Sequence, residues 1–165
     1  MALTVVWMRH AKSSWKDQVT DERRALSPRG ERNAKAAGDL LVSRGMSFDL
    51  VIHSPAERAR ATWTNIASAG VSVGEEREDV TLYEGDADEI VKLVAHSGAS
   101  TILVIGHYPT IPEAVELAAA RESTKKWAAF DLKFPTSAMA FVEADSAEAL
   151  IAGQGKLVGF EIPRG

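Results

Sequence analysis

The chain of 165 residues contains no cysteine. Disulfide bonds, thiolate nucleophiles and cysteine-bound metals are therefore excluded, and the composition is compatible with a reducing cytosol. The sequence also has no apolar stretch of membrane-spanning length, and no basic region followed by a long apolar core near its N-terminus. These absences predict a soluble, cytoplasmic protein with no membrane partner.

An excess of positive charge is missing as well. Lys and Arg number 19 against 23 Asp and Glu, so the formal net charge is -4 and no global basic field would attract nucleic acid. Any site for an anion must then be a local pocket. The hydrophobic fraction of 45% is that of an ordinary globular protein, and the length predicts one domain with a sizeable core over residues 1–165.

Short apolar segments alternate with helical patterns along the chain. Runs rich in β-branched and aromatic residues predict strands over residues 3–8, 48–52, 80–83, 101–105, 137–142 and 156–162, with a polar connector over 71–79. Helices are expected from Pro28 to Gly45, from Pro55 to Gly70, after Asp86, and from Pro109 or Pro112 onward. This alternation predicts an α/β fold, a three-layer α/β/α sandwich with a mostly parallel central sheet.

Three of the helix starts carry capping signals. Ser27 precedes a proline, which is typical of an N-cap followed by the first helical residue. Ser54 and Glu57 have the spacing of a capping box, in which the carboxylate reaches back to the cap. Asp86 and Glu89 have the same spacing, and they are expected to cap the third helix.

A long polar segment, residues 11–26, separates the first strand from the first helix. We expect it to form a loop over the edge of the sheet, and loops of this length are often functional. Trp15 is expected to pack as a core residue that anchors the loop. Arg23, Arg24 and Arg29 are expected to be solvated, or else to form the mouth of a site for a protein substrate.

Three of the expected strands are followed by cationic or titratable residues. Arg9 and His10 come at the end of the first strand, Arg58 lies one helical turn beyond the second, and His107 follows residues 101–105. Because the carboxyl ends of parallel strands lie along one edge of a sheet, we expect these four side chains to converge. Two guanidinium groups and two imidazoles would form a phosphate pocket, in which a neutral histidine can act as a nucleophile.

The same residues form three motifs in a fixed order: Arg9-His10-Ala11, then Ser54-Pro55-x-x-Arg58-Ala59-x-x-Thr62, then Gly106-His107-x-Pro109. Together they resemble the histidine phosphatase superfamily, which has the phosphoglycerate mutase-like fold. The short chain, the opening Arg9-His10-Ala11-Lys12-Ser13 and the later Leu26-Ser27-x-Arg29-Gly30 are most similar to the SixA-type phosphohistidine phosphatases. The resemblance covers most of residues 3–118, although Ala11 stands where the family usually has glycine.

This resemblance implies a phosphatase that needs neither a metal nor a cofactor. His10 would be the nucleophile that takes the phosphoryl group, and Arg9, Arg58 and His107 would hold the phosphate and stabilise its charge. Positive neighbours would keep His10 neutral near pH 7, and water would hydrolyse the phospho-His10 intermediate. A metal site at the two histidines is disfavoured, because the arginines would repel a cation.

Three further residues are candidates for the site. Lys16 stands where many members of the family have an asparagine that contacts phosphate, and it either donates to phosphate or is solvated. Ser13 belongs to the opening motif and is expected to bind substrate. Glu84 is the expected general acid, which an alkoxide leaving group requires and an imidazole leaving group needs far less.

The function that follows is a phosphohistidine phosphatase acting on a phosphorylated protein, because so short a chain has little room for inserted segments that would enclose a small substrate. One alternative is a phosphomonoesterase for a small phosphorylated metabolite. Another is a non-catalytic module that binds phosphate or a phosphoprotein, against which the presence of both histidines argues. The sequence does not specify the physiological substrate, the pathway or the oligomeric state.

Overall fold

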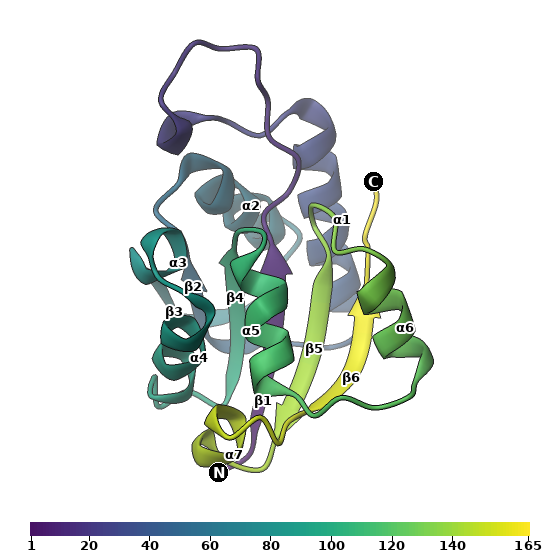
Figure 1. Ribbon diagram of the computed structural model, residues 1–165. Helices are drawn as coiled ribbons and strands as arrows, with labels where there is room; N and C mark the ends of the chain where they lie inside the picture. The colour runs from purple at the N-terminus through teal and green to yellow at the C-terminus, as the bar shows by residue number, and fades with distance from the viewer.

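The computed structural model describes residues 1–165 and contains one six-stranded sheet with the strand order β3-β2-β4-β1-β5-β6 (Figure 1). The strands are β1 Leu3–Arg9, β2 Phe48–His53, β3 Val73–Glu78, β4 Thr101–Gly106, β5 Met139–Ala144 and β6 Lys156–Glu161. The pairs β1–β4, β2–β4 and β2–β3 are parallel, whereas β5 pairs antiparallel with both β1 and β6. The predicted mostly parallel sheet is therefore confirmed.

Helices cover both faces of this sheet (Figure 1). They are α1 Pro28–Ser43, α2 Glu57–Ser68, α3 Thr81–Glu84, α4 Ala87–Ala95, α5 Thr110–Ala118, α6 Lys125–Leu132 and α7 Ala147–Ile151, with a short 3-10 helix η1 Asp21–Arg23. Alternate residues of β1 point to opposite faces: Val5 and Trp7 belong to a core with α4 and α5, whereas Val6 and Met8 belong to a core with α1 and α2. The three-layer α/β/α arrangement is thus confirmed. No helix combines the length and the apolar character needed to cross a membrane.

Two of the three capping predictions are confirmed. The hydroxyl oxygen of Ser27 accepts a hydrogen bond from the backbone of Gly30, and the Asp86 carboxylate accepts one from Glu89. The capping box at Ser54 is wrong. Helix α2 begins two residues later than that pattern implies, with Ala56 as an N-cap that has no side-chain bond, because the Ser54 hydroxyl is used elsewhere.

The weakest strand predictions are also corrected. Residues 71–79 are not a polar connector, since they contain the edge strand β3, whose charged side chains are mostly exposed. A solvated edge strand has little apolar periodicity, so its pairing with β2 decides its conformation. Residues 80–83 fall instead in and next to the short helix α3. The sequence pattern predicts no helix at α6 or at α7, which the structure adds.

Candidate active site

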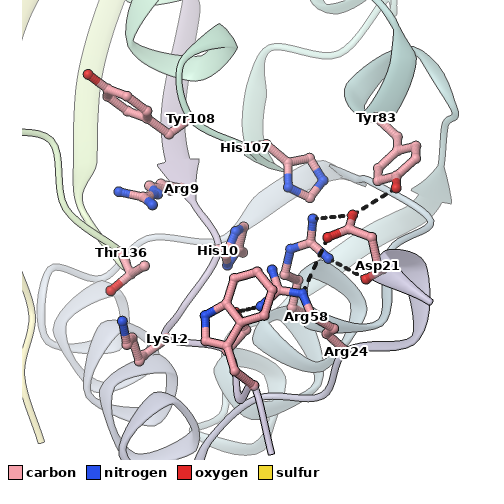
Figure 2. Close-up of a pocket in the computed structure, with 12 residues that line it drawn as sticks. Arg9, His10, Lys12, Asp21, Arg24, Arg58, Tyr83, His107, Tyr108 and Thr136 are labelled. Carbon is pink, nitrogen blue, oxygen red and sulfur yellow. Dashed lines mark hydrogen bonds and ion pairs between the residues drawn. The ribbon is translucent and has the colours of Figure 1, made fainter. Parts of the chain in front are cut away.

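The three strands that carry the motifs lie side by side in the order β2-β4-β1, and their carboxyl ends are level. Arg9 is in register with Gly106, and the backbone N–H of His10 continues the ladder by donating to the Gly106 carbonyl at 2.9 Å. The ring centroids of His10 and His107 are 5.1 Å apart. Both rings, together with Arg9 and Arg58, line one cavity of about 560 Å³, so the predicted convergence of the four side chains is present (Figure 2).

His10 is buried and its tautomer is fixed by a backbone contact. Nδ1 donates a hydrogen bond to the Ala11 carbonyl oxygen at 2.7 Å. A carbonyl oxygen can only accept, so the proton resides on Nδ1 and the lone pair on Nε2. Burial first, and then the neighbouring His107, Arg58 and Arg9, lower the pKa of His10 to about 3, against the opposing hydrogen bond to Ala11. The ring is neutral at pH 7, as expected, but burial contributes more than the positive neighbours do.

His107 is the second neutral imidazole of the site. Burial lowers its pKa to about 4, with the nearby charge of Arg58 acting in the same direction. Its Nε2 lies 2.8 Å from the Ser54 hydroxyl, which also accepts a hydrogen bond from the backbone N–H of Ala56. The serine that would have formed a capping box therefore orients this histidine and the turn before α2.

Arg58 is held by an acidic residue that the sequence argument missed. Its two terminal nitrogens donate to the backbone oxygen of Asp21 at 2.7 Å and to the Asp21 carboxylate at 2.9 Å. The Tyr83 hydroxyl donates to the same carboxylate at 2.8 Å, and Arg24 forms an ion pair with it at 3.3 Å. The hydrogen bond from Tyr83, followed by those from the arginines, lowers the pKa of Asp21 to about 2. No local pattern marks Asp21, because its partners are 3, 37 and 62 positions away.

Two expectations about the long loop are wrong. Arg24 is buried rather than solvated, and its guanidinium donates to the Ser13 hydroxyl at 2.9 Å. Trp15 is not a core residue, since 75% of it is exposed. The guanidinium of Arg24 stacks on the indole at 3.5 Å from the ring centroid, so the ring is placed at the rim of the cavity by a cation–π contact.

Arg9 lies on the opposite side of His10 from Asp21 (Figure 2). One of its terminal nitrogens donates to the Phe134 carbonyl at 3.1 Å, and its guanidinium carbon is 5.1 Å from the centre of the Tyr108 ring. The Nε atoms of Arg9 and Arg58 are buried and have no hydrogen-bond partner in the protein.

The structure does not bring every candidate residue to the cavity. Ser13 lines it, as expected. Lys16 is exposed and lies outside the lining, where Lys12 is found instead. Glu84 is exposed on α3 and is not among the lining residues either, whereas its neighbour Tyr83 is. Asp21 is the one carboxylate that lines this cavity.

The arrangement is suited to an attack by His10 on a phosphoryl group. A neutral imidazole with a free Nε2 lies among guanidinium groups that can neutralise the oxygens of the transferring group. No cluster of three or more His, Asp or Glu side chains is placed to hold a metal ion. The cationic side chains that line this cavity are Arg9, Arg24, Arg58 and Lys12.

Comparison with known proteins gives consistent results. The model of the histidine phosphatase superfamily (branch 1) matches residues 5–86. A solved protein from Nakamurella multipartitia, provisionally assigned as the phosphohistidine phosphatase SixA, is 32% identical, with a TM-score of 0.83 over 99% of this chain and 97% of that one.

Two more distant solved structures share the fold. The protein histidine phosphatase SixA in complex with tungstate is 22% identical, with a TM-score of 0.77 over 99% of this chain and 97% of that one. A phosphoglycerate mutase from Plasmodium falciparum is 15% identical, with a TM-score of 0.64 over 100% of this chain and 94% of that one.

Proposed function

This chain belongs to the histidine phosphatase superfamily, in its SixA-type branch, and from that premise we propose that it removes the phosphoryl group of phosphohistidine in a protein through a covalent phospho-His10 intermediate. Membership of the superfamily, together with the likeness to SixA-type proteins, supports phosphatase chemistry. The proposed substrate is a phosphoprotein, and the proposed nucleophile is Nε2 of His10.

The state of His10 is the observation that carries this proposal. Its Nδ1 proton is engaged by the Ala11 carbonyl, which leaves the Nε2 lone pair free inside the cavity. A pKa of about 3 keeps the ring unprotonated at every pH at which a cell operates. The nucleophile therefore needs no general base, and as it attacks phosphorus the Ala11 carbonyl stabilises the positive charge that develops on the ring.

Arg9, Arg58 and His107 are proposed to bind the phosphoryl oxygens. All three side chains line the cavity that contains His10. A preorganised donor of this type typically contributes a factor of about 10²–10³ to the rate of a phosphoryl or acyl transfer. The two guanidinium groups supply the positive charge that stabilises the transferring group, so the proposed reaction uses no metal ion.

The reaction has two balanced steps. Nε2 of His10 first forms a bond to phosphorus while the P–N bond breaks, and the substrate histidine, protonated by solvent on its other ring nitrogen, leaves as neutral imidazole with the electron pair of that bond. A water oxygen then bonds to phosphorus, the bond to Nε2 breaks and its electron pair returns to His10. Inorganic phosphate leaves with one proton of the water, and the other proton passes to solvent. Both transfers take place beside the same two arginines, Arg9 and Arg58.

The absence of a poised acid from the lining supports phosphohistidine as the substrate. Glu84 lies outside the cavity, and Asp21 has a pKa of about 2, so it is ionised at neutral pH and cannot donate a proton. An alkoxide would need that proton, whereas an imidazole is a far better leaving group. The exposed Trp15 at the rim is also compatible with a substrate presented on a protein surface.

The test is His10→Asn with a phosphohistidine protein. The amide nitrogen of asparagine can still donate to the Ala11 carbonyl, so folding should be retained, but no phosphoenzyme can form. We expect turnover to fall by at least about 10³-fold, and an acid-labile phosphoenzyme, seen in the wild type after rapid quenching, to disappear.

His96→Gln is the matched control, because His96 lies at the end of α4, outside the cavity. It should retain both turnover and the phosphoenzyme. Turnover retained by a folded His10→Asn protein would refute the proposed nucleophile. Turnover of aryl phosphate without turnover of phosphohistidine would refute the proposed substrate.

A further inference from the structure

A second group of cations lies beside the cavity, on the side away from Asp21. We call Lys12, Arg29 and Arg164 the basic wall. Lys12 lines the cavity together with Thr136, and in Figure 2 both are drawn on the far side of His10 from Asp21. All three cationic side chains are exposed.

Backbone packing brings Lys12 next to Arg29. The Lys12 carbonyl accepts hydrogen bonds from the backbone N–H of Ser27 at 2.9 Å and from the Ser27 hydroxyl at 3.1 Å. A Cβ atom on Gly30 would lie 2.0 Å from the same carbonyl oxygen, so only glycine permits this approach. Lys12 is therefore fixed against the first turn of α1, which contains Arg29.

The C-terminal residues bring Arg164 to the same place. Its guanidinium donates to the Thr136 carbonyl at 3.2 Å, and the backbone N–H of Gly165 donates to the buried Asn33 side chain of α1 at 2.9 Å. Partial burial, and next to it the charge of Arg29, lowers the pKa of Arg164. Arg29 and Arg164 are thus close enough to repel each other.

None of these three cations is neutralised by the protein. Lys12, Arg29 and Arg164 have no carboxylate within 4.0 Å, whereas Arg24 and Arg58 both pair with Asp21. Clustering like charges costs free energy unless a partner of opposite charge is present. The formal net charge of the protein is -4, yet no carboxylate forms an ion pair with any of these three cations.

We propose that the basic wall binds carboxylate side chains that flank the phosphohistidine of a protein substrate. This inference rests on the proposed function, and it adds the chemical character of the substrate surface. Arg9, Arg58 and His107 at the floor of the cavity hold the phosphoryl group, and the basic wall beside them attracts acidic neighbours and orients the substrate. Exposed charges act mainly on association, so the effect appears in KM and depends on ionic strength.

The experiment measures binding without turnover. His10→Asn protein is titrated with peptides that carry a stable phosphonate analogue of phosphohistidine, flanked either by glutamates or by glutamines. We expect the acidic peptide to bind about fivefold more tightly at low salt, because three exposed charge pairs each contribute little. Replacing the basic wall, Lys12→Gln with Arg29→Gln and Arg164→Gln, should abolish that preference, so that the two peptides bind equally.

A matched control removes the same charge elsewhere. Lys125, Lys126 and Lys156 are also exposed and unpaired, and they lie outside the cavity lining. Their triple replacement by glutamine should keep the preference for the acidic peptide. Thermal unfolding of both triple variants verifies that each is folded.

Several outcomes would overturn the inference. They are equal binding of the two peptides by His10→Asn protein, loss of the preference in the control variant, and an advantage for a small bisphosphate but not for the acidic peptide. Because the titration needs no turnover, failure of the proposed chemistry would appear separately, as a missing phosphoenzyme in the wild type.

Discussion

The two sides of the cavity carry cations in opposite electrostatic states. On one side, Arg24 and Arg58 are buried and share the carboxylate of Asp21; we call these three residues the balanced wall. On the other side, the basic wall is exposed and has no carboxylate partner. The difference teaches that the number of cations in a cavity does not reveal their role. Burying a guanidinium costs free energy unless a group of opposite charge lies close to it. An exposed guanidinium is stabilised by water and needs no such partner.

Removing Arg58 should produce the largest change on the balanced wall. In Arg58→Gln, the donors to phosphate are lost and Asp21 keeps only Arg24 as a cationic partner. We expect kcat/KM to fall by about 10²–10³-fold. Arg60→Gln on the same helix is the control, because Arg60 pairs with Glu57 and Glu78 outside the cavity, and it should change kcat/KM by less than about twofold. Similar losses in both variants would contradict the assigned role of Arg58.

Asp21→Asn tests how much the ionised carboxylate of Asp21 contributes to the free energy of unfolding. The folded pKa of Asp21 is about 2, against 3.8 for the free group, so its ionised form stabilises the fold above pH 3.8 and that contribution is lost as the pH falls toward 2. Half of this side chain is exposed, so the expected loss in Asp21→Asn at pH 7 is only about 1 kcal/mol. Urea unfolding at pH 7 and at pH 2.5 measures the difference from the wild type, which should shrink at the lower pH.

Asp17→Asn provides the reference for that comparison, because Asp17 is exposed in the same loop and makes no ion pair. Its stability should match the wild type within about 0.5 kcal/mol at both pH values. A difference for Asp21→Asn that stays constant from pH 7 to pH 2.5 would show that the carboxylate charge is not what its partners stabilise.

Glu84→Gln should have the smallest effect, since Glu84 belongs to neither wall. Its exposed side chain on α3 leads us to expect kcat/KM within about twofold of the wild type, for phosphohistidine and for an aryl phosphate alike. Steady-state kinetics with both substrates would check this. A tenfold drop confined to the ester would restore Glu84 as the acid and favour a small-molecule phosphomonoesterase.

The elements that the sequence predicts well are the buried ones, because their burial appears as a run of apolar residues. The strands at 3–8, 48–52 and 101–105 are apolar on both faces, and the structure places them next to one another at the centre of the sheet. The edge strand β3 was predicted as a connector because its side chains contact solvent and leave no periodic signal. Helix α3 was predicted as a strand because four residues carry too few turns to show a helical period.

The residues of the site also fall into two groups, those that local sequence pattern predicts and those that it does not. Arg9, His10, Arg58 and His107 each follow a strand within a few residues, so parallel pairing alone predicts that they meet. Asp21, Tyr83 and Arg24 reach the cavity from a loop and a short helix, whose paths depend on long-range contacts. Residue type alone misplaces Trp15. A large aromatic side chain is expected in the core, but the buried Arg24 stacks on the indole and keeps it at the surface.

The sequence by itself determined the three-layer fold, the order of the motifs and the four side chains that converge on one sheet edge, because these depend on periodicity and strand order. Only the tertiary structure decided which of the cations are neutralised. Pairing depends on distances of a few ångströms between residues far apart in the chain, and Coulomb energies change steeply over that range. Asp21 beside Arg58, and the lack of any carboxylate beside Lys12, are consequences of packing that no local pattern records.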